Sequence, residues 1–568
     1  MRRQLLSLRL LSIRSSRRTL LLRPRRIAIM RMSWFIRTCS VVCRRWRLLL
    51  RFGRSGRFMR HMPGWTLAPY VTSDFQLHGL TAITTVVASL VGGLFRLPLA
   101  KIIDIWGRPE GLALMVLFMT IGSIMMAATD SVQMYCAAEV FSVTGGNGRN
   151  YILSVLLADT SQLKNRGLIL AYIASPYIIT TFTSGYFADS MLNGPGWRWA
   201  FGIFAILHPV LNAPLFLLLM IYQKKAIKMG LVPIRNTGRS MMQSIKYYLV
   251  EFDIFGLFLI VSGLAIFLLP FSLYSYQGAT LEEQWSSALV VSMIVIGLVL
   301  IIAFVVWEAK FAPVTFVPYH LLRDRTVVGA FILAAVLFVE FYIWNSYFTS
   351  FLQVVPNLDL VRVGYISGIY SMGSCFWSFG VGAITRYTGD YKYQTLLFGM
   401  PLTILGVALM IIFRQPDVNV GYIVMCQIFI AFGGAALVVG QQVAVMAVTT
   451  HQYVAVVLAI LAVGSSIGGA IGSTIAGAVW TGTFPADLAR LLPPETVANA
   501  TIIAGDIATQ LSYPVGDPSR IAIQQSYGNA QRYMLIAATA ITALGFPAVA
   551  IWKNVDVRQR KQVKGRVF

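Results

Sequence analysis

Glu340 is a carboxylate in the middle of an apolar run, where it could take up and release a proton. The run reads Val-Glu-Phe-Tyr-Ile-Trp-Asn-Ser-Tyr over residues 339–347. In a helix, Glu340, Trp344 and Tyr347 would be spaced i, i+4 and i+7 and would share one face. Removal from water favours the protonated carboxyl, and the two aromatic rings could line a cavity wall. The alternative is a structural glutamate bonded to a neighbouring helix, with rings that only fill space.

A second apolar run carries Glu139 and, ten residues later, Arg149. Ionisable residues inside long apolar runs are costly and are therefore candidates for function. The helical rise separates these two by about 15 Å, so each needs a partner on another helix or a water-filled cavity. We expect Glu139 to carry protons or contact substrate, and Arg149 to contact substrate. A structural ion pair is the alternative.

Further aromatic and amide side chains in the apolar runs could line the same cavity. They offer ring surfaces or hydrogen-bonding groups to an organic ligand, and helix packing is the alternative for each. The candidates are Tyr172, Tyr177, Tyr370, Trp377, Gln441 and Gln442.

The elements that must position these residues are membrane-spanning helices. The chain has 568 residues, of which 57% are hydrophobic and 12% charged, and its mean hydropathy is +0.69. Soluble domains are about one quarter charged, so the composition argues against a water-soluble enzyme. A span needs about 20 apolar residues, and the lipid requires each backbone to satisfy its own polar groups. Thirteen runs qualify: 80–100, 111–129, 134–158, 167–188, 199–222, 253–274, 286–307, 327–354, 364–385, 394–413, 420–444, 453–481 and 531–552.

Lysine and arginine in the connecting segments predict the orientation of the spans. One alternating set of loops carries 21 of these residues and the other carries 5. The richer set, which includes the C-terminus, is expected on the cytoplasmic side. The sequon Asn499-Ala500-Thr501 then falls in the loop 482–530 on the outer side, as a glycosylation acceptor requires.

The basic character of the chain is concentrated in its first 60 residues. The net charge is +25, but residues 1–60 contain 18 Arg and no Lys, Asp or Glu. This localisation gives little support to nucleic-acid binding. Residues 28–50 carry too many arginines to span a membrane. We interpret the segment 1–64 either as resembling an organellar transit peptide or as a non-native, disordered start that replaces a first helix.

No cofactor, metal or catalytic motif stands out. The five cysteines and five histidines are scattered, so we expect neither a disulfide framework nor a metal site. Hydrolase and zinc-protease motifs are absent from the sequence, and we expect no enzymatic activity.

The loop between the first two runs carries a recognisable pattern. Asp104-Ile105-Trp106-Gly107-Arg108 resembles the cytoplasmic loop motif of the major facilitator superfamily. Gly107 permits a tight turn, while Asp104 and Arg108 could pair with helix ends or neighbouring charges.

Longer stretches resemble the fungal siderophore–iron transporter family of that superfamily, from about Trp65 to the C-terminus. They are Trp65-Thr-Leu-Ala-Pro-Tyr-Val-Thr-Ser, residues 158–167, Ser175-Pro-Tyr-Ile, Gly196-Trp-Arg-Trp, residues 464–472, residues 513–518 and Ser526-Tyr-Gly.

The resemblance implies an all-α membrane protein with fourteen helices, as two six-helix bundles plus two intervening helices. It also implies proton-coupled import of ferric hydroxamate siderophores by alternating access. A glutathione or drug proton antiporter of the same superfamily is the alternative. Residues 57–64 depart from the family pattern, so we expect the first helix to be missing or replaced. A non-transporting receptor or defective relic is therefore a further alternative.

The resemblance also assigns residues to the two ends of the path. Asp104, Gly107 and Arg108 belong to the loop motif, and Asp159, Lys164 and Arg166 match a loop that could close an inner gate through charge pairs. Tyr527 matches an outer-loop segment near the entrance and could capture substrate.

We expect a monomeric multi-pass protein, with a ferric siderophore, protons and membrane lipid as its partners. The plasma membrane is the expected location, and an endosomal or vacuolar membrane is the alternative. The predicted division is 1–64, the Arg-rich segment; 65–222, the N-terminal bundle; 223–252, a basic cytoplasmic loop; 253–326, two extra helices and a loop; 327–552, the C-terminal bundle with outer loop 482–530; and 553–568, a basic cytoplasmic tail.

Overall fold

The computed structural model describes residues 70–71, 81–229, 240–274, 277–278, 281–314, 319–450 and 453–559. The segment 1–64, with its predicted transit-like or non-native character, lies outside these residues. Regular structure in the described part is entirely helical, which confirms the predicted all-α class. Nine of the described helices are long and apolar enough to cross a membrane, or eleven if each bent pair is one span.

The first half of the described chain forms a bundle of long helices. Gly107 turns the chain into α5 with a φ of 129°, and Pro109 sits in the first turn of that helix, where its missing N–H is harmless. Ser131 caps α6 by accepting a hydrogen bond from the Met134 backbone N–H at 3.2 Å. The elements are α3 (Thr81–Leu94), α4 (Arg96–Ile105), α5 (Arg108–Ala127), α6 (Val132–Thr160), η2 (Leu163–Asn165), α7 (Arg166–Ala174), α8 (Pro176–Leu192) and α9 (Trp197–Lys228).

The second half begins at α15 and is also a bundle of long helices. Its most deeply buried helices are α20 and α21, in each of which 67% of the most apolar stretch is buried. The elements are α15 (Tyr319–Leu322), α16 (Arg325–Asn345), α17 (Phe348–Val354), α18 (Leu360–Thr388), η5 (Gln394–Gly399), α19 (Met400–Phe413), α20 (Val420–Val448), α21 (Val454–Leu491), η7 (Val497–Asn499), α22 (Ala500–Gly505), α23 (Ile507–Ser512), α24 (Pro518–Thr542) and α25 (Gly545–Ala550).

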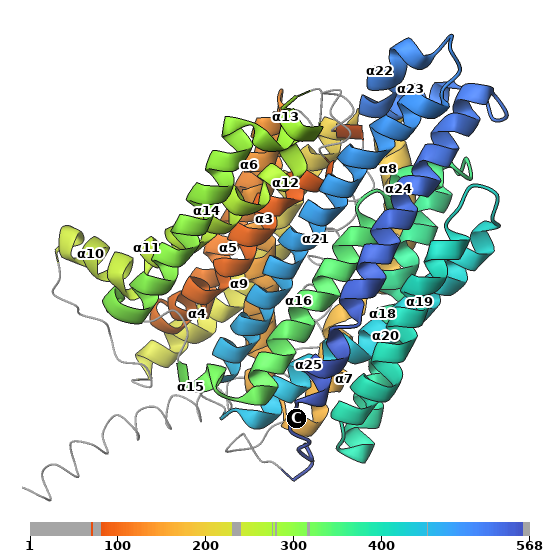
Figure 1. Cartoon of the computed structure of the whole chain (residues 1–568). Helices are drawn as coiled ribbons and strands as arrows, with labels where there is room; N and C mark the ends of the chain where they lie inside the picture. Colours follow the sequence, from red (N-terminus) through yellow and green to blue (C-terminus); the bar gives the residue numbers. More distant parts are fainter. Residues whose placement is uncertain are drawn as a thin grey trace, which may run out of the picture.

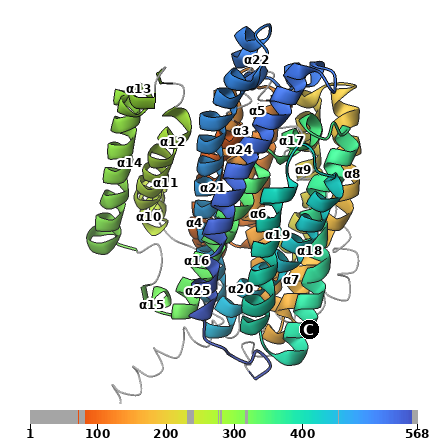
Figure 2. The same ribbon diagram turned by 45° about the vertical axis from the view of Figure 1, so that its right-hand side comes forward.

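Between the halves, a helical hairpin stands beside the bundle (Figure 2). Only 11% of the apolar stretch of α14 is buried, so most of its surface is left for lipid. Asp253 caps α11 from a left-handed backbone conformation, with φ 44° and ψ 55°. The elements are α10 (Met241–Glu251), α11 (Ile254–Leu268), α12 (Pro270–Leu273), α13 (Leu281–Ser286), α14 (Ala288–Val306) and η4 (Trp307–Phe311).

Three of the helix pairs that join the halves are α3 with α21, α7 with α18 and α8 with α18 (Figure 1). Small residues bring these backbones close. A Cβ placed on Gly93 would lie 2.0 Å from the Ser466 Cβ, and one on Gly368 would lie 2.3 Å from the Thr181 Cγ2. The Thr181 hydroxyl also donates to the Gly368 carbonyl at 3.4 Å. Small residues serve this purpose widely in membrane helices.

The predicted loop 482–530 is too long. Helix α21 continues to Leu491 and α24 already begins at Pro518. Hydropathy marks only the apolar part of a helix, whereas α21 extends into a polar stretch where Arg490 pairs with Asp487 at 2.8 Å. The helices α22 and α23 lie at one end of the molecule and the C-terminus lies at the other (Figure 1), in keeping with the predicted sides.

Candidate functional site

Glu340 is buried inside the second half, with 3% of its surface exposed. The Trp344 indole and the Tyr370 hydroxyl lie close enough to interact with its carboxyl group. The rings of Trp344 and Tyr370 have their centroids 5.9 Å apart, nearly at right angles. Among the described residues, the Glu340 Oε1 atom has no hydrogen-bond partner. A buried carboxyl with an unbonded oxygen is suited to hold a proton, because ionisation there would be poorly compensated.

Tyr347 does not share this face, so the predicted three-residue stripe is wrong at its third member. Helix α16 ends at Asn345, and Tyr347 adopts φ −114° and ψ 20° before α17 begins. The break rotates the Tyr347 ring toward α21, where it stacks on Trp480 at 4.1 Å and 10°. The i, i+4, i+7 rule holds only while the helix continues.

Helices α18 and α20 carry four further residues that were predicted for the cavity, of which Tyr370 lies near Glu340. Tyr370 lies against Gly434, where an added Cβ would be 3.1 Å from the Tyr370 hydroxyl. Two turns along α20, Gln441 is buried and its Oε1 atom lacks a partner among the described residues. Two turns along α18, Trp377 stacks on Phe432 at 5.0 Å. Gln442 is half-buried.

The polar residues of the first half lie on α6, α7 and α8. Arg149 is 1% exposed, and its guanidinium donates to the Asn150 side chain at 3.3 Å. Glu139 is half-buried and lies close to Tyr135, one turn earlier on α6. Tyr172 and Tyr177 are half-buried on either side of the break between α7 and α8. Their roles in a substrate path remain predictions.

The loop between α4 and α5 has the turn that its sequence predicts. The Arg108 guanidinium donates to the Ile103 carbonyl at 3.2 Å, at the end of α4. The side chain of Asp104 lies outside the described part. Glu110, which the sequence did not single out, accepts a hydrogen bond from Gln223 at 2.7 Å. This link to α9 spans 113 positions, so no local pattern indicates it.

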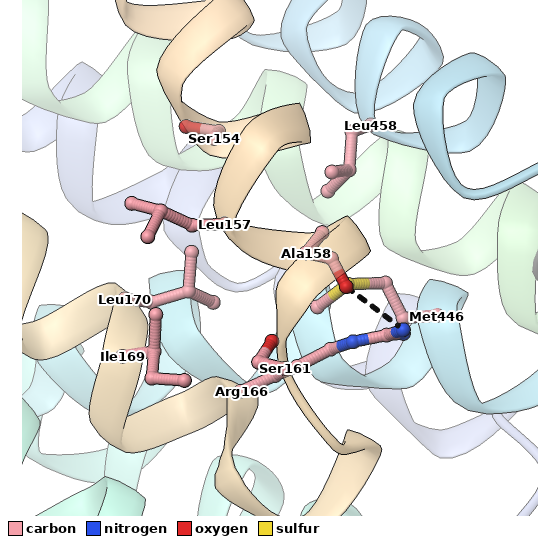
Figure 3. A pocket seen from close by; sticks show the side chains of 9 residues that line it. All are labelled: Ser154, Leu157, Ala158, Ser161, Arg166, Ile169, Leu170, Met446 and Leu458. Carbon is pink, nitrogen blue, oxygen red and sulfur yellow. Dashed lines mark hydrogen bonds between the residues drawn. The ribbon is translucent and has the colours of Figure 1, made fainter. Parts of the chain in front are cut away.

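Arg166, which was predicted to belong to an inner gate, lies at the boundary between the halves. Its guanidinium is buried and donates to the Ala158 carbonyl at 3.3 Å. Figure 3 shows the small pocket beside it, which Met446 of α20 and Leu458 of α21 also line. Lys164 is exposed, and the side chain of Asp159 lies outside the described part. The inner gate and its charge pairs therefore remain a prediction.

Two buried arginines, Arg414 and Arg520, were not predicted from the sequence to have a role. The Arg414 guanidinium donates to the Trp344 carbonyl at 2.7 Å and lies over the Phe348 ring at 4.4 Å. Arg520 donates to the Val354 carbonyl at 2.8 Å. Both cations therefore bind carbonyls at helix C-termini, which have no intrahelical donor. Both stand near the ends of apolar runs, where they look like ordinary loop charges.

Tyr527 is not in an outer loop, so that prediction is wrong. It lies within α24 and is fully buried. Its hydroxyl donates to the Gln510 side chain at 2.8 Å, and its ring packs edge-on against Trp480 at 4.9 Å. Asp517 and Pro518 start α24 earlier than hydropathy indicates. In this conformation Tyr527 holds the outer helices together and does not meet solvent.

Within the described ranges, no group of three His, Cys, Asp or Glu side chains could hold a metal ion.

Comparison with known proteins places these features in a family. Residues 56–312 match the Major Facilitator Superfamily model. The chain is 55% identical over 502 residues to MFS siderochrome iron transporter 1 of Ajellomyces capsulatus, covering 88% of this chain and 85% of that protein. The chain belongs to the siderophore iron transporters of the major facilitator superfamily. It is also 44% identical to Siderophore iron transporter mirB of Emericella nidulans, over 93% of this chain and 86% of that protein.

The fold of this family member is also found in solved structures. A bacterial homolog of the human lysosomal transporter Spinster, crystallised in an inward-facing and occupied conformation, aligns with a TM-score of 0.52 and 16% identity. The alignment covers 90% of this chain and 97% of that protein. The predicted major facilitator fold is confirmed, and the chain is a multi-pass membrane protein.

Proposed function

We propose that this siderophore-family transporter imports a ferric hydroxamate siderophore together with protons, by alternating access between its two halves. The observation that carries the proposal is the buried Glu340 carboxyl beside Trp344 and Tyr370. An ionisable carboxyl is costly inside a membrane protein, so it is a candidate for function. The function we assign to it is to exchange a proton when water or substrate reaches it. The relatives named above supply the substrate class.

The iron enters this scheme as cargo already wrapped by its chelator. The ring surfaces of Trp344 and Tyr370 and the amide of Gln441 suit the apolar and carbonyl-rich surface of an organic chelate. The protein then recognises the shape of the chelate and the polar groups at its rim. Other ligand pockets likewise combine apolar walls with a few polar groups.

Proton coupling follows from the surroundings of Glu340. While the carboxyl is buried, its neutral form is favoured; when the path opens to a compartment of higher pH, the proton leaves and the carboxylate gains water. Substrate and proton loading thereby favour the same rearrangement. We assign the protein to the plasma membrane as a monomer that performs no catalysis.

Uptake of a radiolabelled ferric trihydroxamate into cells or proteoliposomes tests this function. An inward proton gradient is expected to drive accumulation, and a protonophore is expected to abolish it. Export of glutathione or a cationic dye in exchange for protons, without chelate uptake, would instead identify an antiporter. Binding of the chelate without accumulation under any gradient would identify a receptor.

A further inference from the structure

Helix α10 is amphipathic and lies at the end of the molecule predicted to be cytoplasmic. Its start is fixed by a capping box, in which Ser240 and Gln243 exchange hydrogen bonds. Helix α10 meets α11 at a bend of 50°. A helix that turns aside just before a membrane span is well placed to lie along the membrane surface.

One part of the apolar side of α10 packs against the loop between α4 and α5. The ring of Tyr248 meets Trp106 edge-on at 5.5 Å, and Phe252 meets it at 6.3 Å. At the end of α10, the Glu251 carbonyl accepts a hydrogen bond from the Lys101 ammonium at 2.8 Å. The helix is therefore held in a defined orientation against the first half.

The rest of the apolar side is exposed. Met242, Ile245 and Leu249 are 74%, 46% and 50% exposed, and their spacing of three and four residues places them in one ridge. The exposed apolar surface continues along the chain into the first turns of α11, where Phe255 and Phe258 are 53% and 65% exposed. Because the sequence predicts a membrane span over residues 253–274, this surface continues the one expected to face lipid.

Exposed lysines accompany the ridge. Lys246 lies on α10, and Lys224, Lys225 and Lys228 lie at the end of α9. The end of α9 reaches the loop between α4 and α5 through the hydrogen bond from Gln223 to Glu110. The lysines of α9 and α10 therefore lie around this loop. The acidic neighbours are Glu251, Asp253 and Glu308, close to Lys101; Asp253 is 3% exposed.

We propose that α10 lies in the cytoplasmic leaflet, with Met242, Ile245 and Leu249 among the acyl chains and the four lysines bound to anionic phospholipid headgroups. Apolar ridge and basic rim are the two attractions that hold interfacial helices, and each lysine near an anionic surface adds about a fivefold preference. Through Trp106, the lipid surface then fixes the loop between α4 and α5. The proposal does not depend on the substrate of the transporter.

The test uses the full chain in membrane discs of phosphatidylcholine alone or with phosphatidylserine. An environment-sensitive dye is attached to Ile245→Cys or, as the matched control on the polar side, to Tyr247→Cys, after the native cysteines are replaced by alanine. We expect the dye at position 245, but not at 247, to be quenched by lipids that carry a nitroxide on the acyl chain. Phosphatidylserine should strengthen the quenching, and Lys246→Gln should weaken it about fivefold.

Hydrogen exchange of residues 240–252 in the unmodified chain provides a second measurement that needs no substitution. Slower exchange in discs with phosphatidylserine than in discs without it supports the proposal. Equal quenching at positions 245 and 247, or protection of position 245 that lipid nitroxides do not reach, overturns it in favour of a solvent-facing helix or a protein contact.

Discussion

Gly167 of α7 and Gly382 of α18 meet backbone to backbone across the two halves, next to the buried Arg166. A Cβ on Gly167 would lie 3.2 Å from the Gly382 Cα, and a Cβ on Gly382 would lie 2.7 Å from the Leu168 amide nitrogen. On the same side, the Tyr151 hydroxyl of α6 donates to the Ala455 carbonyl of α21 at 2.9 Å. The described residues therefore form a closed inner seam whose distances leave no room for a side chain.

Gly382→Val is expected to prevent this seam from closing. The added side chain meets backbone, which cannot yield as a flexible side chain does, so the inner side should stay open and uptake should fall at least tenfold. Initial rates of chelate uptake and maleimide labelling of inner-seam positions measure both effects. Gly202→Val is the control, because its nearest neighbours are 3.7 and 4.0 Å away. Normal uptake by Gly382→Val would show that transport does not require this seam to close.

Glu340→Gln is expected to abolish proton-driven accumulation while the protein still folds and binds the chelate. The amide keeps the size of the side chain but cannot exchange a proton. Uptake and equilibrium binding across a pH series separate these effects. Glu495→Gln, at an exposed position, is the control. Unchanged accumulation at every pH would reject the assigned role of Glu340.

Trp480→Ala is expected to destabilise the outer half by about 3 kcal/mol, because it leaves a cavity in a buried aromatic stack. The Trp480 ring lies 4.1 Å from Tyr347 and 4.4 Å from Phe484. Thermal or denaturant unfolding in detergent measures the loss. Trp199→Ala removes a ring that is 61% exposed and should change stability little; equal losses would argue against a packed outer core.

Arg414→Gln is expected to cost about 1.5–3 kcal/mol, the range for a hydrogen bond to a charged group. The substitution removes the cation that binds the Trp344 carbonyl, where α16 ends. Unfolding in detergent again provides the measurement. Arg490→Gln breaks an exposed pair with Asp487, for which less than about 1 kcal/mol is expected. A smaller loss at Arg414 than at Arg490 would contradict the end-capping role.

The attachment of the C-terminal tail is expected to depend on pH. Hydrogen bonds from Arg558 hold the pKa of Asp556 at about 2, below its usual 3.8. The Val557 backbone N–H donates to the Gly389 carbonyl at 3.1 Å, beside this pair. Because the folded pKa is depressed, the stabilisation is complete above pH 4 and disappears as pH falls toward 2. The protection of residues 553–559 from hydrogen exchange, relative to the intrinsic rate at each pH, should fall in that window, and Asp556→Asn should remove the change.

Much of the architecture follows from composition and motif. Apolar runs specify helices because lipid leaves no other way to satisfy the backbone, and each of the thirteen predicted runs coincides with one or more helices of the structure. Gly107 indicates its turn locally, since a φ of 129° is strained for any residue with a Cβ. Glu340 and Trp344 share a face because α16 continues through both.

The sequence alone determined the helical class, the family and the buried carboxyl. Only the tertiary structure decided which side chains and helices contact one another. Tyr347 leaves its predicted face because α16 breaks, Tyr527 is buried because α24 starts early, and Gly167 meets Gly382 although 215 positions separate them. Hydropathy and periodicity report the environment of one helix at a time, whereas a closed seam depends on the packing of two helices from different halves.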